Sequence, residues 1–260
     1  MKKSILFVAI VFLFNNVFSQ GNEYLVFEFM KVANDQELSY METEDFWEKI
    51  HTQRIKNGNI IGWDLWSLES GDEEQQFQYL TVAVYDDSIK MFSNSLDFGS
   101  ALNDAYLELT DVELDEKFNK TSKSRELALR LYLEIIDGTT DDFNMEKGTI
   151  ANIEFMNSMG NIKAYEKAEI EIFLPLHQKA VDNGKKGNWS LISILPQSVG
   201  DIKASHLTIN MYKGVEEYLK SQESIESLGI TPELNKKIID GLKTRDVKRK
   251  YIATLIKKVR

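Results

Sequence analysis

Two histidines stand at matching places in helix-like segments and are the side chains best suited to chemistry in this chain. His51 lies four residues after Trp47, and His177 lies four residues after Phe173. This spacing puts each histidine on the apolar side of a helix, near its C-terminal end. Either residue could bind haem iron or act as a general base, or it could be a structural histidine that stabilises the helix end. Because duplicated enzymes often lose one site, the occurrence of both histidines favours the structural interpretation.

Tryptophans accompany both histidines. Trp63 and Trp189 each open a strand-like segment just after the helix. They could stack on a flat ligand, although a tryptophan there more often packs over the preceding helix. Trp47 and Trp66 have no tryptophan at the matching places, so either could belong to an aromatic pocket present in one half only.

Two glutamates stand in the middle of apolar strands. Glu28 and Glu154 are costly there unless they are paired or hydrated. They could be acids with a raised pKa in a pocket. The favoured interpretation is an ion pair with a base of the last strand in each half, such as Arg130 or Lys250.

The third histidine has no histidine counterpart. His206 takes the place of Tyr79, and it shares one face of a strand with Tyr212. These polar faces could line a cavity or form a hydrogen-bonded interface. His206 is the better candidate for a function specific to one half.

An internal duplication explains these matches. Sliding the chain by 126 residues aligns its two halves without a gap over a long stretch, and the offset then changes to 127 and finally to 120. The ordered matches are Phe27-Glu28-Phe29-Met30 with Ile153-Glu154-Phe155-Met156, His51 with His177, Asn57-Gly58 with Asn183-Gly184, Trp63 with Trp189, Tyr85 with Tyr212, and Arg125 with Arg245.

Each half has the pattern β-α-β-β-α-β. In the first half we expect strands at 25–32, 62–69, 77–85 and 125–136, and helices at 42–56 and 88–120, the second interrupted near Gly99. Alternation in the last strand predicts that Leu127, Leu129, Leu131, Leu133 and Ile135 share one face.

In the second half we expect strands at 149–157, 188–196, 204–213 and 245–258, and helices at 162–183 and 214–242. Pro175 should kink or break the first of these helices near residue 174. The polar, turn-rich stretch 137–147 marks the boundary between a unit at 20–138 and a unit at 147–260.

The N-terminus has the features of a targeting signal. Residues 1–19 combine two lysines, an apolar run and a small residue before a cleavage point, which is typical of a cleaved signal peptide. We expect a periplasmic or secreted protein that does not remain inserted in a membrane. The chain has no cysteine, so disulfides, thiol nucleophiles and a lipid-modified cysteine are excluded.

The charge balance excludes nucleic acid as the main partner, because the formal net charge is −10. The segment 243–260 is strongly basic on an acidic body. We expect internal ion pairs there first, and contact with an anionic surface second. Phosphate-binding loops, metalloprotease and hydrolase motifs are missing, and the scattered histidines predict no metal site.

The element order, together with the phrase helix–His–five residues–Asn-Gly–four residues–Trp, resembles the dimeric α/β-barrel superfamily. This superfamily includes antibiotic-biosynthesis-monooxygenase-like and NIPSNAP-like proteins, and the chain also resembles exported Bacteroidetes-type proteins. The resemblance implies an α+β fold in which two tandem ferredoxin-like units close one barrel within the chain. Chlorite-dismutase-like haem proteins also use tandem units of this kind.

Two functions remain open. The first is an exported, non-catalytic protein that binds a small molecule or acts in a stress response, with no cofactor, as a monomer or homodimer. The alternative is an oxidoreductase or monooxygenase, haem-dependent or cofactor-free. The ligand-binding candidates are His51, Trp63, His177, Trp189, His206, Glu28, Glu154, Tyr79 and Tyr212.

Overall fold

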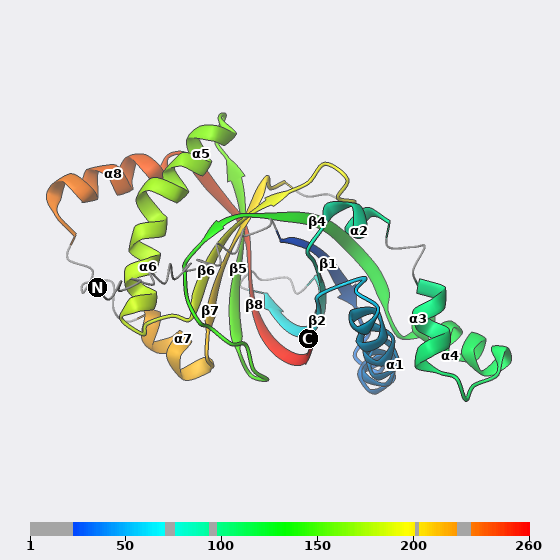
Figure 1. Ribbon diagram of the computed structural model, residues 1–260. Helices are drawn as coiled ribbons and strands as arrows, with labels where there is room; N and C mark the ends of the chain where they lie inside the picture. The colour runs from blue at the N-terminus through cyan, green and yellow to red at the C-terminus, as the bar shows by residue number, and fades with distance from the viewer. Residues whose placement is uncertain (1–22, 71–75, 94–97, 201–202, 223–229) are drawn as a thin grey trace, which may run out of the picture.

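The computed structural model describes residues 23–70, 76–93, 98–200, 203–222 and 230–260, and its two halves have the same order of elements (Figure 1). The first half contains β1 (Tyr24–Lys31), α1 (Glu37–Lys56), β2 (Gly62–Ser70), β3 (Tyr79–Tyr85), α2 (Ser88–Phe92), α3 (Phe98–Ala105), α4 (Asp111–Ser124) and β4 (Glu126–Gly138). The second half contains β5 (Ile150–Ser158), α5 (Ile162–Ala168), the π-helical turn η1 (Glu169–Phe173), α6 (Leu174–Asp182), β6 (Asn188–Ile194), β7 (His206–Tyr212), α7 (Val215–Gln222), α8 (Pro232–Leu242) and β8 (Arg245–Val259).

The strands form one closed antiparallel barrel in the order β1-β3-β2-β8-β5-β7-β6-β4. Each half supplies four strands, and the halves join where β2 meets β8 and where β4 meets β6. Figure 1 shows the helices of the first half on one side of the barrel and those of the second half on the other. The α+β class and the closure of a barrel within one chain are thereby confirmed.

The barrel interior is the main hydrophobic core, and it draws on both halves. Phe29 of β1 lies against Phe155 of β5 and Tyr251 of β8, with ring centroids 5.9 Å apart in both pairs. Leu131 and Leu133 of β4 are fully buried in the same cluster. Side chains at the alternate positions point outward and pack under the helices, as the period of a strand requires.

A β-bulge at Ala128 corrects one prediction about β4. Phe29 is opposite Leu129, but Met30 is opposite Leu127, so one residue of β4 is extra. The bulge turns Leu127 to the outer face, whereas strict alternation predicted that it would share the inner face. β8 has the same irregularity at Lys248, between the partners of Phe155 and Met156.

The sequence predicted that Pro175 would kink or break its helix near residue 174, and the structure shows a π-helical turn just before that residue but no break. The chain stays helical from Ile162 to Asp182, and the π-helical turn η1 ends just before α6, which holds Pro175. The proline lies in the first turn of α6, where its missing N–H is best tolerated. A π turn holds one residue more than an α turn, so it accommodates an extra residue without ending the helix.

The predicted interruption near Gly99 is confirmed, because α2 ends at Phe92 and α3 begins at Phe98. A further break, which the sequence did not predict, comes between α3 and α4. There Thr110 caps α4, accepting from the Glu113 backbone while the Glu113 side chain accepts from the Thr110 N–H. This capping box fixes the start of α4.

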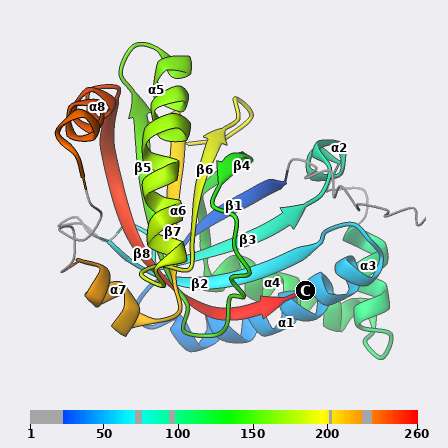
Figure 2. The ribbon, with the colours of Figure 1, turned by 60° about the vertical axis from the view of Figure 1, so that its left-hand side comes forward.

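The basic C-terminal strand forms internal ion pairs, as expected. Figure 2 shows β8 running from the side of α8 to the side covered by α1. Lys257 contacts Glu48 of α1 at 2.5 Å, and Arg260 holds the buried Asp64 of β2 through two hydrogen bonds of 2.8 and 2.9 Å. No helix in the described ranges is both long enough and apolar enough to cross a membrane.

Candidate functional site

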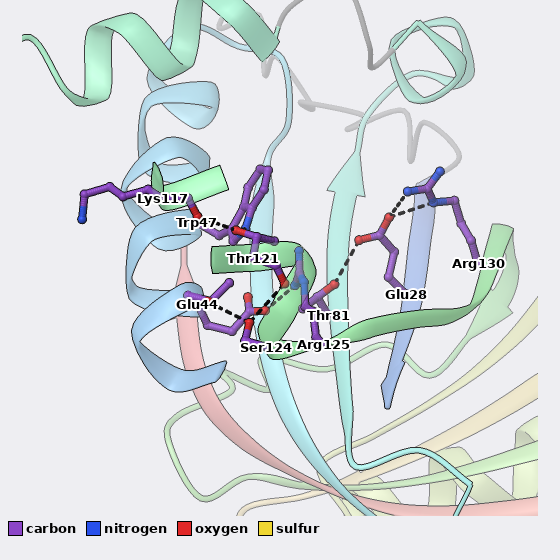
Figure 3. A network of polar contacts seen from close by, with 10 residues as sticks. Glu28, Glu44, Trp47, Thr81, Lys117, Thr121, Ser124, Arg125 and Arg130 are labelled. Atoms are coloured by element: carbon purple, nitrogen blue, oxygen red, sulfur yellow. Dashed lines mark hydrogen bonds and ion pairs between the residues drawn. The ribbon is translucent and has the colours of Figure 1, made fainter. Parts of the chain in front are cut away.

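A cavity of about 540 Å³ lies in the first half, between α1 and the outer face of the sheet. Three predicted site residues line it, namely Glu28, His51 and Trp63. We call this space the first-half cavity. Its further walls come from α2, α3 and β4, and its polar side is drawn in Figure 3.

His51 and Trp63 form a stacked pair at the cavity wall. Their ring centroids are 4.9 Å apart and the rings are nearly parallel, at 16°. Trp63 is buried. Arg54, one turn further along α1, donates to His51 Nδ1 at 3.2 Å and to the Tyr85 hydroxyl at 3.1 Å. The tryptophan therefore has the packing role that the sequence favoured, and the histidine is held between an indole and a cation.

The Arg54 contact decides the protonation state of His51. A guanidinium can only donate, so Nδ1 must offer its lone pair, and the ring proton sits on Nε2. Burial lowers the pKa of His51 well below its usual value, and Arg54 and Arg125 lower it further. His51 is therefore a neutral imidazole at pH 7.

This arrangement does not fit a histidine that binds haem iron. A metal-binding histidine offers one ring nitrogen to the metal and donates its other N–H to a carboxylate, a carbonyl or water. In His51, Nδ1 accepts from the cation Arg54 and carries no proton. If Nε2 bound the metal, Nδ1 would have no N–H to donate to such a partner. In the described part of the chain, no group of three His, Cys, Asp or Glu side chains is placed to hold a metal ion.

A buried ion pair forms the cavity wall nearest α4. Glu44 of α1 pairs with Arg125, the residue that precedes β4 (Figure 3). Burial raises the pKa of Glu44, and Arg125 opposes that shift. Burial and the neighbouring Glu44 raise the pKa of Tyr40 well above its usual value, so this phenol stays protonated beside the carboxyl group. The bulge at Ala128 gives Arg125 the outward direction that this pair needs.

A second ion pair lies across the sheet. Glu28 accepts from Arg130 Nε at 2.7 Å and from the Thr81 hydroxyl at 3.5 Å, and all three residues are on neighbouring strands (Figure 3). The sequence predicted this pairing of Glu28 with the last strand. Its counterpart in the second half is also present, since Lys250 Nζ lies 2.7 Å from Glu154.

The second half repeats the stacked histidine with different polar neighbours. His177 and Trp189 have ring centroids 4.6 Å apart and an angle of 17°. Lys186 contacts His177 Nδ1 at 2.9 Å and Asn210 Oδ1 at 2.5 Å. Burial lowers the pKa of Lys186 to about 8. Burial, Lys186 and Arg245 also lower the pKa of His177. Its Nδ1 faces the Lys186 ammonium as that of His51 faces Arg54, so neither ring makes the second-nitrogen contact of a metal-binding histidine.

The buried Tyr–Glu–Arg group also recurs, although the sequence comparison missed it. Glu169 accepts from Arg245 at 2.5 Å, and burial and Glu169 raise the pKa of Tyr165. Tyr40 and Glu44 match Tyr165 and Glu169 at an offset of 125, whereas the histidines match at 126. The π turn η1 lies between the two pairs and absorbs the additional residue. An ungapped comparison could not show this match.

His206, Tyr79 and Tyr212 lie on the outer faces of their strands under the helices. His206 is buried, with Nδ1 2.8 Å from the Ser205 hydroxyl and Nε2 3.3 Å from Glu166. Both ring nitrogens of His206 contact protein side chains, and His206 does not line the first-half cavity. Tyr79 packs on Tyr40, with centroids 4.4 Å apart, and Tyr212 packs on Tyr218 at 5.4 Å.

The first-half cavity combines flat rings with positive charge. Its rings include Trp47, Phe92, Phe98 and Tyr132, none of which was among the nine candidates. Three guanidinium groups line it (Arg54, Arg125, Arg130) against two carboxyl groups (Glu28, Glu44). Such a lining suits a flat molecule with a negative charge. Two features of the sequence could have indicated this lining. They are the alternation of side chains along β4 and Trp47, which has no tryptophan at the matched place.

Comparison with known proteins shows what this fold is similar to. No family model matches, and no curated protein matches. Among solved structures, a putative monooxygenase from Fusobacterium nucleatum subsp. nucleatum ATCC 25586 has a TM-score of 0.56 at 14% identity, over 91% of this chain and 93% of that one. An anthrone oxidase-like protein has a TM-score of 0.53 at 8% identity, over 93% and 94%.

A heme-binding protein from Thermus thermophilus has a TM-score of 0.50 at 8% identity, over 91% of this chain and 95% of that one. At these identities the likeness shows the fold alone. The chain shares its overall fold with these three solved structures.

Proposed function

We propose that this protein binds a small, planar aromatic acid in the first-half cavity. The ligand would lie against the aromatic wall formed by Trp47, Phe98 and Tyr132, and its acidic group would meet Arg125 and Arg130. The volume of about 540 Å³ falls within the range of small-molecule sites.

The observation that carries this proposal is the difference at one pair of matched positions. Ala83 lines the first-half cavity, and the residue at its place in the second half is Asn210. Asn210 reaches Lys186, which in turn reaches His177. The small side chain leaves open in the first half a space that polar side chains occupy in the second.

The proposal is tested by native mass spectrometry and tryptophan fluorescence with 1-naphthoate, naphthalene and 1-naphthylamine. We expect saturable binding of the acid, with quenching of Trp47 and Trp63, and weaker binding of the neutral and basic analogues. Equal binding of all three compounds would contradict an acid site. Binding of none of them would contradict the proposal for aromatic ligands altogether.

A second candidate function is the cofactor-free oxidation of such a ligand by dioxygen. Glu44 favours it, because burial raises the pKa of this carboxyl group at the cavity wall, which makes it a better proton acceptor for a ligand hydroxyl. Two structural neighbours, a putative monooxygenase and an anthrone oxidase-like protein, point the same way. An oxygen electrode tests it: ligand-dependent oxygen consumption that is lost in Glu44→Gln would support catalysis. Ligand binding without oxygen consumption would contradict catalysis and leave the binding proposal standing.

The two halves arose, in our proposal, by duplication of one ferredoxin-like unit, with the boundary within 139–146. The repeated element order, the repeated stacked histidines and the repeated bulges at Ala128 and Lys248 support it. A barrel closed within one chain makes a monomer a sufficient unit. Light scattering of the purified protein distinguishes the monomer from a homodimer.

Export to the periplasm or the medium remains a proposal that rests on residues 1–19, which lie outside the described residues. N-terminal sequencing of the protein from the periplasmic and extracellular fractions tests it. We expect Gln20 as the first residue, and an intact Met1 or a cytoplasmic product would contradict cleavage.

A further inference from the structure

A second, smaller cavity continues the first-half cavity outward. It has a volume of about 320 Å³. Four side chains belong to the walls of both spaces (Phe92, Leu127, Arg130, Tyr132). Phe92 at the end of α2 and Tyr132 of β4 lie 5.2 Å apart between ring centroids. The two spaces are therefore adjoining parts of one groove, and we call the smaller one the outer groove.

The far wall of the outer groove comes from the second half. Gln197 and Val199 belong to the connection between β6 and β7, and both line the outer groove. This connection is fixed to β4, because Val199 N donates to Arg130 O at 2.9 Å and Leu195 N donates to Tyr132 O at 2.8 Å. The second half thus completes an extension of the site that the first half contains.

The outer groove is largely apolar and open to water. Val199 is 67% exposed, Phe92 46% and Leu127 42%. The bulge at Ala128 is the reason that Leu127 points here and not into the barrel. Exposed apolar side chains that continue a binding cavity stabilise a ligand when an apolar part of that ligand covers them.

We infer that the ligand is an amphipathic aromatic acid whose apolar substituent lies in the outer groove. The acid-bearing ring occupies the first-half cavity, and the substituent passes Phe92 and Tyr132 towards Val199. This inference rests on the proposed function, and it adds the substrate class and a specificity-determining residue from the other half, Val199.

The test compares benzoate, 4-methylbenzoate and 4-butylbenzoate by isothermal titration calorimetry on the full chain. We expect affinity to rise about two- to fourfold per methylene, because each buried methylene contributes at most about fourfold and the groove is open on one side. Val199→Trp fills the groove and should remove this gain, measured as the ratio of the affinities for 4-butylbenzoate and benzoate. Val215→Trp is the matched control, since Val215 is an exposed valine of α7.

Gln197→Trp gives a second test on the same wall and should also reduce the gain. Equal affinity across the series would overturn this inference but leave the proposed function standing. A gain that persists unchanged in both Val199→Trp and Gln197→Trp would overturn it too. If no member of the series binds, the proposed function fails first and this inference fails with it.

Discussion

The two halves share a scaffold and differ in what surrounds it. Both have a histidine stacked on a buried tryptophan, a buried glutamate paired with an arginine, and a strand glutamate paired with a base. Among the matched positions that differ, Trp47 corresponds to Phe173 and Ala83 to Asn210. Arg54 and Lys186 reach the two histidines from positions that do not match. The repeated groups are common to both halves, and the unrepeated ones distinguish the first-half cavity from the second half.

The largest effect is expected where the scaffold is the same. Arg125→Met and Arg245→Met each leave a buried glutamate without its cation, which costs about 3 kcal/mol of unfolding free energy. Urea denaturation at pH 7.5 measures both losses, and we expect them to be similar. The double variant Glu44→Gln, Arg125→Met should recover part of the first loss. A loss in one half only would show that the two pairs are not equivalent.

The next effect concerns the positions that differ. Ala83→Asn places the second-half side chain in the first-half cavity, and we expect the affinity for 1-naphthoate to fall more than tenfold by excluded volume. Calorimetric titration measures this change, and denaturation should show little change in stability. Asn210→Ala is the matched control and should leave the affinity unaltered. An unaltered affinity in Ala83→Asn would place the ligand elsewhere.

The histidines should make stability depend on pH in both halves. Burial lowers the pKa of His51 and His177 in the folded protein, so near and below pH 6.5 the unfolded chain binds more protons and stability decreases as the pH is lowered. Between pH 7.5 and 5.5 each histidine contributes a loss of up to about 1.4 kcal/mol. Glu44 and Glu169, whose pKa values burial raises, act in the opposite direction.

The contribution of each histidine to the pH dependence of the unfolding free energy is therefore measured with variants. His177→Gln and His51→Gln should each flatten the pH profile of the unfolding free energy relative to the parent chain. A profile that keeps its slope in both variants would mean that neither imidazole is neutral when folded.

The smallest effect concerns Trp47. Its Nε1 donates to Thr121 Oγ1 at 3.2 Å, a bond that phenylalanine at the matched place cannot make. Trp47→Phe and Thr121→Val should each cost about 1 kcal/mol of stability. Only Trp47→Phe should also weaken ligand binding, because Thr121 does not line the cavity wall described above. Equal effects of both variants on binding would remove Trp47 from the site.

Strand patterns in the sequence predicted the barrel well, because alternating apolar and polar residues show directly which side chains share a face of the sheet. The segment 125–136 was predicted as a strand despite its good helix formers, and β4 covers Glu126–Gly138. The pairs of Glu28 with Arg130 and of Glu154 with Lys250 followed from the same reasoning and are present. The bulge at Ala128 was not predictable, since one extra residue in a strand leaves no mark in an alternating apolar run.

The candidate site was predicted only in part. Glu28, His51 and Trp63 line the first-half cavity, but Arg54 and Arg125, which set the charge and protonation there, were not candidates. Arg125 needs the bulge to face outward, and Lys186 reaches His177 from a position that does not match Arg54 in the chain. Which side chains meet at a site depends on their distances in the folded chain. A comparison of aligned residues does not contain those distances.

The central claim is that the first half, and not the second, holds the ligand site. Isothermal titration calorimetry with 1-naphthoate tests it most directly through the stoichiometry. We predict one ligand per chain in the parent protein and in Asn210→Ala, and strongly weakened binding in Ala83→Asn. Two ligands per chain, or one ligand that Ala83→Asn leaves undisturbed, would contradict this account.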